Sequence, residues 1–152
     1  MIHAIDHINI VVSDLERSVR FYTEVLGLRE IRRASLSGEW IERIVGLSGV
    51  RAEVAYVLAE AGEPRIELLQ YLAPQGTSLP ECALPNTRGL RHIAFRVNDI
   101  EATCKKLRKA GVPLVGPPVH VPSEVITHSA GEKILCYFHD PDGVLLELAE
   151  YR

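Results

Sequence analysis

The sequence predicts an α+β fold built from two tandem copies of one strand-helix-strand module, and two alignments within the chain carry this prediction. His7 to Ser18 aligns without a gap with His92 to Thr103. Ile66 to Tyr71 aligns in the same way with Leu146 to Tyr151. Both alignments pair the first half of the chain with its second half, in the same order and at a similar spacing. An internal repeat of one module explains them.

Each copy is expected to begin with a strand and continue into a helix. Residues 5–12 and 90–97 are β-branched or apolar runs of strand length. A short polar residue and a glutamate three positions later then have the spacing of a capping box: Ser13 with Glu16, and Asn98 with Glu101. Apolar residues at helical spacing predict helices that end before Gly27 and Gly111, since glycine accepts the left-handed turn after a helix.

The rest of each copy predicts further strands. Strand-like runs separated by turn signals lie at Glu53–Leu58, Arg65–Tyr71, Ile134–Phe138 and Val144–Tyr151, with turns at Ala61–Pro64 and Asp140–Gly143. Residues 32–52 and 113–132 have no sustained period and are interpreted as edge strands and long loops near a binding site. We therefore expect one domain over residues 1–152, with a first module at about 3–72, a linker at about 73–88 and a second module at about 89–152.

The amino-acid composition limits the classes of partner that we expect for this chain. Of the 152 residues, 47% are hydrophobic and 24% charged, and the net charge of -3 predicts neither a nucleic-acid interface nor a basic membrane face. The chain shows no leader-like start and no apolar run long enough to span a membrane, so a cytoplasmic protein with a small-molecule partner is expected. The three cysteines are odd in number and widely spaced, which favours structural roles: Cys82, Cys104 and Cys136.

The repeat places two residue types with metal-binding chemistry at equivalent positions. Each copy has a histidine at the start of its first strand, His7 or His92, and a glutamate inside its last strand, Glu67 or Glu147. An ionised carboxylate between apolar neighbours is costly to bury unless a cation or strong hydrogen bonds compensate it. If the modules pack about a pseudo-twofold axis, the four side chains converge on one divalent ion. Zn, Ni and Co are the favoured ions for such an N2O2 set, with Fe and Mn as alternatives.

The same segments give the chain its family resemblance. It resembles the vicinal oxygen chelate superfamily, which contains glyoxalase I, methylmalonyl-CoA epimerase, extradiol dioxygenases and the bleomycin and fosfomycin resistance proteins. The residues that carry the resemblance span nearly the whole chain: Asp6–Ile8, Ser13–Leu15, Phe21–Tyr22, Leu26–Leu28, Arg65–Leu68, His92–Phe95, Asn98–Ile100 and Phe138–Glu147. The resemblance implies paired βαβββ modules whose curved mixed sheets form a metal-binding cleft, commonly in a homodimer.

The resemblance also implies a class of chemistry. Family members chelate a substrate with vicinal oxygens, in some cases a thiol or thioester conjugate, and the ion stabilises charge on an enolate-like oxygen. A glyoxalase-like lyase or isomerase would use all four ligands, with Glu67 or Glu147 as the base that moves a proton next to a carbonyl. The carboxylate at Glu67 favours this interpretation.

Three alternatives stay open. An acyl-CoA epimerase of the methylmalonyl-CoA type would need another acidic group, for which Glu39, Glu42 and Glu53 are candidates. An extradiol dioxygenase would need only His7, His92 and Glu147 on Fe(II), with His128 and Tyr137 as acid/base or substrate contacts. A non-enzymatic drug-binding protein would need no metal, and the retention of four ligand positions argues against it.

Overall fold

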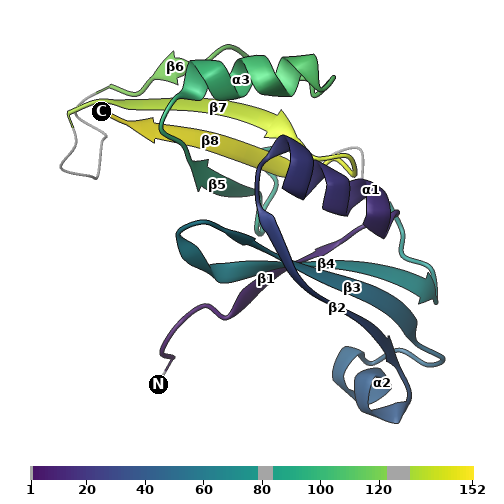
Figure 1. The fold of residues 1–152 in the computed structure, drawn as a ribbon. Coiled ribbons are helices and arrows are strands. Elements are labelled where there is room, and N and C mark those ends of the chain that lie inside the picture. The colour runs from purple at the N-terminus through teal and green to yellow at the C-terminus, as the bar shows by residue number, and fades with distance from the viewer. Residues whose placement is uncertain (1, 79–83, 123–130) are drawn as a thin grey trace. The chain divides into compact units, whose positions relative to one another are not determined.

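The computed structural model describes residues 2–78, 84–122 and 131–152, and the chain divides into two compact units, residues 1–78 and 79–152 (Figure 1). The first unit contains β1 (His7–Val11), α1 (Leu15–Arg20), the π-helical turn η1 (Phe21–Val25), β2 (Arg29–Ser37), α2 (Glu39–Val45), β3 (Arg51–Ala59) and β4 (Gly62–Ala73). The second contains β5 (His92–Arg96), α3 (Ile100–Lys109), β6 (Val119–His120), β7 (Lys133–His139) and β8 (Leu145–Tyr151).

Both units build the same four-stranded mixed sheet. Its strand order is β1-β4-β3-β2 in the first unit and β5-β8-β7-β6 in the second. In each, the first strand pairs in parallel with the last, and the other neighbours are antiparallel. The predicted tandem α+β organisation is therefore confirmed, and the last strand of each unit lies between two neighbours.

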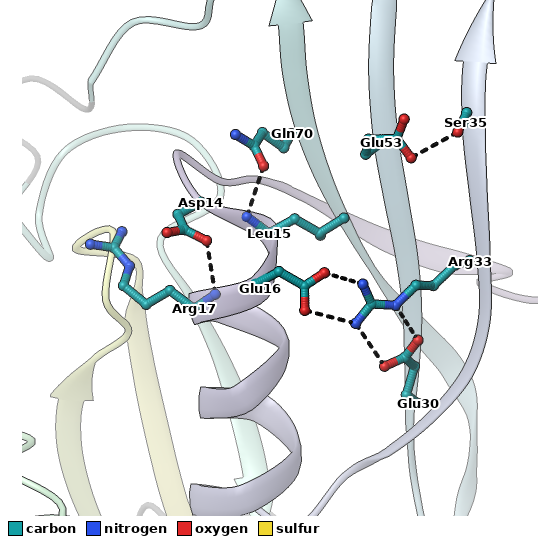
Figure 2. Close-up of polar contacts among 9 residues, drawn as sticks. All are labelled: Asp14, Leu15, Glu16, Arg17, Glu30, Arg33, Ser35, Glu53 and Gln70. Carbon is teal, nitrogen blue, oxygen red and sulfur yellow. Dashed lines mark hydrogen bonds and ion pairs between the residues drawn. The ribbon is translucent and has the colours of Figure 1, made fainter.

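Side chains along this central strand point alternately to the helix-covered face of the sheet and to its opposite face. Ile66 and Leu68 of β4 are buried on the α1 side, and the Gln70 side chain on that side accepts the Leu15 amide at 2.9 Å (Figure 2). Leu146 and Leu148 are buried in the same way in β8, where Glu150 accepts the Ile100 amide at the start of α3 at 2.7 Å. Since side chains alternate along a strand, the residues between them point to the other face.

The helix caps lie one residue later than the sequence predicts. Asp14 and Asp99, rather than Ser13 and Asn98, are the N-caps, and their carboxylates accept the amides of Arg17 and Ala102 at 2.9 and 2.8 Å. Both caps still have extended backbones, with φ of -144° and -148°. α1 and α3 each begin at the residue whose amide donates to a side chain of the central strand.

The glutamate of the first predicted capping box is engaged elsewhere. Glu16 forms an ion pair with Arg33 of β2, whose guanidinium also binds Glu30, as Figure 2 shows. These two carboxylates raise the pKa of Arg33 above its ordinary value. This network of ion pairs links the exposed side of α1 to β2, the edge strand of its sheet.

The first helix changes from α-helical to π-helical hydrogen bonding after Arg20. After α1, the amide of Leu26 reaches back five residues to the carbonyl of Phe21 at 3.1 Å, while the Thr23 hydroxyl donates to the Val19 carbonyl at 2.8 Å. A threonine side chain that bonds a carbonyl four residues back competes with the regular helical ladder and bends the helix. The wider turn buries Phe21 and Tyr22 with their rings edge to face, 5.2 Å apart.

Other segments differ from the expectation in part. Residues 32–52 contain α2, which has no side-chain cap because Gly38, at a φ of 91°, precedes it, so no start signal was present. The turn predicted at Ala61–Pro64 exists but lies earlier, at Glu60 and Ala61, because β3 ends at Ala59 and β4 begins at Gly62. The turn at Asp140–Gly143 is confirmed: the Asp140 carboxylate accepts the amides of Asp142 and Val144 at 2.9 and 2.8 Å. Within the described ranges, no helix is long and apolar enough to cross a membrane.

Replacing Asp99 by alanine should lower the free energy of unfolding by about 1 kcal/mol, because the Ala102 amide loses its acceptor. The neighbouring Asn98→Ala change is the matched control and should have a much smaller effect. Urea unfolding followed by circular dichroism measures both. A larger loss for Asn98→Ala would show that the cap is one residue earlier.

Candidate metal centre

The first unit brings one predicted pair of ligands together. His7 begins β1 and Glu67 lies in the middle of β4, on the face away from α1. The His7 Nε2 atom lies 3.5 Å from a carboxylate oxygen of Glu67, and the two side chains are 41% and 14% exposed. One nitrogen and one oxygen ligand thus lie side by side at the sheet surface.

The second unit repeats this arrangement. His92 begins β5 and Glu147 lies in the middle of β8. The His92 Nε2 atom lies 3.4 Å from a carboxylate oxygen of Glu147, whose side chain is only 6% exposed. The two pairs therefore match in residue types, in position within the sheet and in separation.

A tyrosine lies beside each pair. From the sequence, Tyr137 is expected only as a contact of a dioxygenase, and Tyr56 is not identified. Tyr56 lies directly opposite Glu67 in the β3–β4 ladder and donates its hydroxyl hydrogen to Glu67 at 2.6 Å. Tyr137 lies directly opposite Glu147 in the β7–β8 ladder. The repeat offered a signal for this role, because each copy has a tyrosine at an equivalent place: Tyr56 after Ala55, and Tyr137 after Cys136.

Burial and the neighbouring carboxylates raise the pKa values of both tyrosines. Burial, followed by the hydrogen bond and charge of Glu67, raises the pKa of Tyr56 to about 12. Burial and then the charge of Glu147 also raise the pKa of Tyr137 above its ordinary value. Both phenols therefore keep their protons at neutral pH, and Tyr56 donates its hydrogen to Glu67.

The first unit holds its pair with additional side chains. Asp6 lies 2.8 Å from the other ring nitrogen of His7, and because a carboxylate only accepts, this nitrogen carries the hydrogen and leaves Nε2 as a ligand. Asn9 donates its amide to Glu67 at 2.8 Å. Arg65 pairs with Asp6 and lies over the Tyr56 ring, 5.5 Å from its centroid.

The donor atoms fit a divalent ion. Two ligands that each lie about 2.1 Å from an ion at a near-tetrahedral angle are roughly 3.4 Å apart. The nitrogen–oxygen separations of 3.5 and 3.4 Å agree with this value. Among the described residues no group of three or more His, Cys, Asp or Glu side chains is placed to hold one ion, so each unit by itself presents a pair of ligands.

The acidic residues considered for an acyl-CoA epimerase are engaged elsewhere. Glu39 pairs with Arg43 along α2, and Glu42 accepts the amides of Gly49 and Val50. Glu53 accepts the Ser35 hydroxyl at 2.9 Å (Figure 2). Since Glu53 is three positions from Tyr56 in a regular stretch of β3, it points to the opposite face from Glu67.

The remaining candidates lie away from the pairs or outside the described structure. Cys104 and Cys136 are buried free thiols, and burial raises the pKa of Cys104 to about 12. Both are therefore core residues, as expected. His128 and Cys82 lie outside the described residues.

Comparisons with known proteins show the family and the fold of the chain. Residues 4–148 match the family described as the Glyoxalase/Bleomycin resistance protein/Dioxygenase superfamily. A 2-epi-5-epi-valiolone epimerase of Actinomyces sp. is 32% identical over 95% of this chain and 78% of its own length. A probable lactoylglutathione lyase of Synechocystis sp. is 31% identical over 95% of this chain and 92% of its own. The crystal structure of a glyoxalase family protein from Bacillus cereus has a TM-score of 0.87 at 32% identity, covering 99% of this chain and 95% of the other.

Replacing Glu67 by glutamine should lower the pKa of Tyr56 from about 12 towards its ordinary value, because a negative charge next to the phenol is lost. Burial, the larger cause, should keep that pKa above the ordinary value. Carbon-13 NMR of the tyrosine Cζ atoms over a pH titration measures the change. Glu53→Gln, on the opposite face of the same sheet, is the matched control, and an equal shift in both variants would contradict the assignment.

Proposed function

Because the chain belongs to the glyoxalase/bleomycin resistance protein/dioxygenase superfamily, we propose that it is a metal-dependent lyase or isomerase that transfers a proton next to a carbonyl group. In this proposal His7, Glu67, His92 and Glu147 hold one divalent ion in a single domain over residues 1–152. The observation that supports it most is the repetition of one His-Glu-Tyr arrangement in both units, with nearly equal separations of 3.5 and 3.4 Å.

A bound divalent ion supplies Lewis-acid stabilisation of negative charge on the substrate oxygens. One of the two carboxylates, Glu67 or Glu147, takes the proton from the hydroxyl-bearing carbon beside the carbonyl; the electron pair of that C–H bond forms a C=C double bond while the carbonyl π pair moves onto the carbonyl oxygen. The resulting carboxylic acid then returns the proton to the former carbonyl carbon, the hydroxyl proton passes to the former carbonyl oxygen, and the hydroxyl-bearing carbon becomes the new carbonyl, so the product is an isomer of the substrate. Tyr56 holds the Glu67 carboxylate in place by donating a hydrogen bond to it, and Tyr137 lies at the equivalent place opposite Glu147.

The names of two relatives favour proton transfer over oxygen chemistry. One is named a probable lactoylglutathione lyase and the other an epimerase, and both reactions are compatible with removal and return of a proton at carbon. A glyoxalase-like reaction on a thiol hemithioacetal is our first candidate because it uses carboxylates in both units. An epimerase that acts next to a ketone or thioester is the second candidate, supported by the relative that is 32% identical.

A substrate panel tests the reaction. The protein is loaded separately with Ni, Co, Zn and Fe(II), and each form is offered the methylglyoxal–glutathione hemithioacetal, a 2-methyl acyl-CoA, a polyhydroxy ketone and a catechol. We expect turnover of the hemithioacetal with Ni, Co or Zn. Turnover of the ketone or acyl-CoA alone would favour the epimerase, and turnover of the catechol alone with Fe(II) would overturn proton transfer.

The ligand set has a separate test. Glu67→Gln and Glu147→Gln should each weaken metal binding by more than about tenfold, because a neutral amide replaces a charged ligand. Competition with a chromophoric chelator measures the affinity, and Glu53→Gln is the control that should bind as the parent does. Unchanged affinity in both site variants would refute the assignment.

A further inference from the structure

Two positively charged side chains flank one aromatic ring at the end of the second sheet. The guanidinium carbon of Arg96 lies 4.9 Å from the centroid of the Tyr151 ring, and the ammonium nitrogen of Lys133 lies 5.2 Å from the same centroid. Arg96 belongs to β5 and Lys133 to β7, which are the two neighbours of β8 in the sheet. The two cations therefore approach the ring from both sides of the central strand. We call these three residues the basic cluster.

The basic cluster lies on the same face of the sheet as Glu147. Tyr151 follows Glu147 by four residues, and residues an even number of positions apart in a strand share a face. Lys133 lies directly opposite Tyr151. Arg96 lies two positions after Ala94, which is the residue opposite Glu147. At a rise of about 3.3 Å per residue, the cluster lies roughly 13 Å from Glu147 along β8.

The acidic side chains at this end of the sheet surround a different cation. Glu150 accepts a hydrogen bond from the Arg152 guanidinium at 2.5 Å. That hydrogen bond and the charge of Glu150, followed by the charges of two more carboxylates, raise the pKa of Arg152 above its ordinary value. Within the part of the chain that the structure describes, neither Arg96 nor Lys133 forms an ion pair with an acidic side chain. Their charges repel each other and lack a nearby anion.

The first copy of the module has the tyrosine without the two cations. Ala52 lies opposite the equivalent tyrosine, Tyr71, where Lys133 lies in the second copy. Val11, at the position equivalent to Arg96, is also uncharged. The pairing of strands, which the two sheets share, therefore does not explain the cations. All three residues of the basic cluster also lie outside the segments that carry the family resemblance.

The chemistry of the basic cluster fits an anion with several oxygens. Arginine offers planar N–H donors that match a carboxylate or a phosphate, and lysine adds a compact positive charge. The aromatic ring between them attracts both cations and restrains them near one another. We propose that Arg96 and Lys133 bind an anionic group of the substrate, a carboxylate or a phosphate, far from the reacting carbonyl. The assignment to the substrate rests on the proposed function, whereas the binding of an anion does not.

This proposal names a class of substrate. The reacting part lies at Glu147, and the basic cluster lies roughly 13 Å away along the strand. A thiol conjugate with free carboxylates or an acyl thioester with phosphates carries a negative charge remote from its carbonyl. A neutral polyhydroxy ketone has no group for this site.

Anion binding is tested without metal and without substrate. Inorganic phosphate and glutarate are titrated separately into the protein at constant ionic strength, and nitrogen-15 NMR of the arginine Nε–H groups follows binding. We expect a saturable shift of the Arg96 signal with at least one of the two anions. Lys133→Ala, which introduces the residue of the first copy, should weaken this binding by roughly tenfold, because a charge-assisted contact is lost. Lys105→Ala removes an equal charge from the exposed side of α3 and is the matched control.

Two results of this titration would overturn the proposal. One is the absence of a saturable Arg96 shift with either anion. The other is an equal loss of affinity in Lys133→Ala and Lys105→Ala, which would reduce the effect to overall charge. Lys133→Arg retains the positive charge and should retain binding, so it separates a lost charge from a disturbed fold.

Kinetics test the assignment of the anion to the substrate. For the panel substrate that is turned over, Lys133→Ala should raise KM by roughly tenfold and leave kcat nearly unchanged, since the contact lies away from the reacting atoms. The difference should vanish with an analogue that lacks the anion: esterified carboxylates for a thiol conjugate, or pantetheine in place of CoA for a thioester. The analogue that abolishes the difference identifies the anionic group.

An unchanged KM in Lys133→Ala, or turnover of the neutral ketone alone, would overturn the assignment to the substrate. If no substrate of the panel is turned over, the proposed function and this assignment fall together. The phosphate and glutarate titrations still decide whether the basic cluster binds an anion, so the two failures are distinguishable.

Discussion

The central position of the last strand in each sheet is the constraint on which the candidate site depends. β4 and β8 each pair with a parallel neighbour on one side and an antiparallel neighbour on the other. A glutamate in the middle of such a strand has a directly opposed residue on both sides, within reach of its carboxylate. Partners supplied by the neighbouring strands can therefore position an acid that would be costly to bury alone.

The same strands also connect the site to the helices. Gln70 and Glu150, three residues after the two glutamates, accept the first amides of α1 and α3 on the opposite face. One short segment thus presents a ligand on one side and supports a helix start on the other. Strand periodicity explains this division, because residues an odd number of positions apart lie on opposite faces.

The two copies of the module present equal ligand pairs in unequal surroundings. The His-Glu separations of 3.5 and 3.4 Å are nearly the same, and a tyrosine opposes each glutamate. Asp6 and Asn9 have no counterpart of the same chemistry at Arg91 and Ala94. Neighbours rather than the ligands themselves therefore determine how firmly each pair is held.

The sequence by itself determined the tandem α+β fold and which histidine and glutamate pair within each unit, because repeated residues in repeated strands must take equivalent places. It could not locate Tyr56 and Asn9 at the site, since strand register is a long-range property that no local period encodes. It also placed the helix caps one residue early and missed α2, which lacks a side-chain cap. Only the tertiary structure decided which side chains hold each carboxylate, because those contacts join strands that are far apart in the chain.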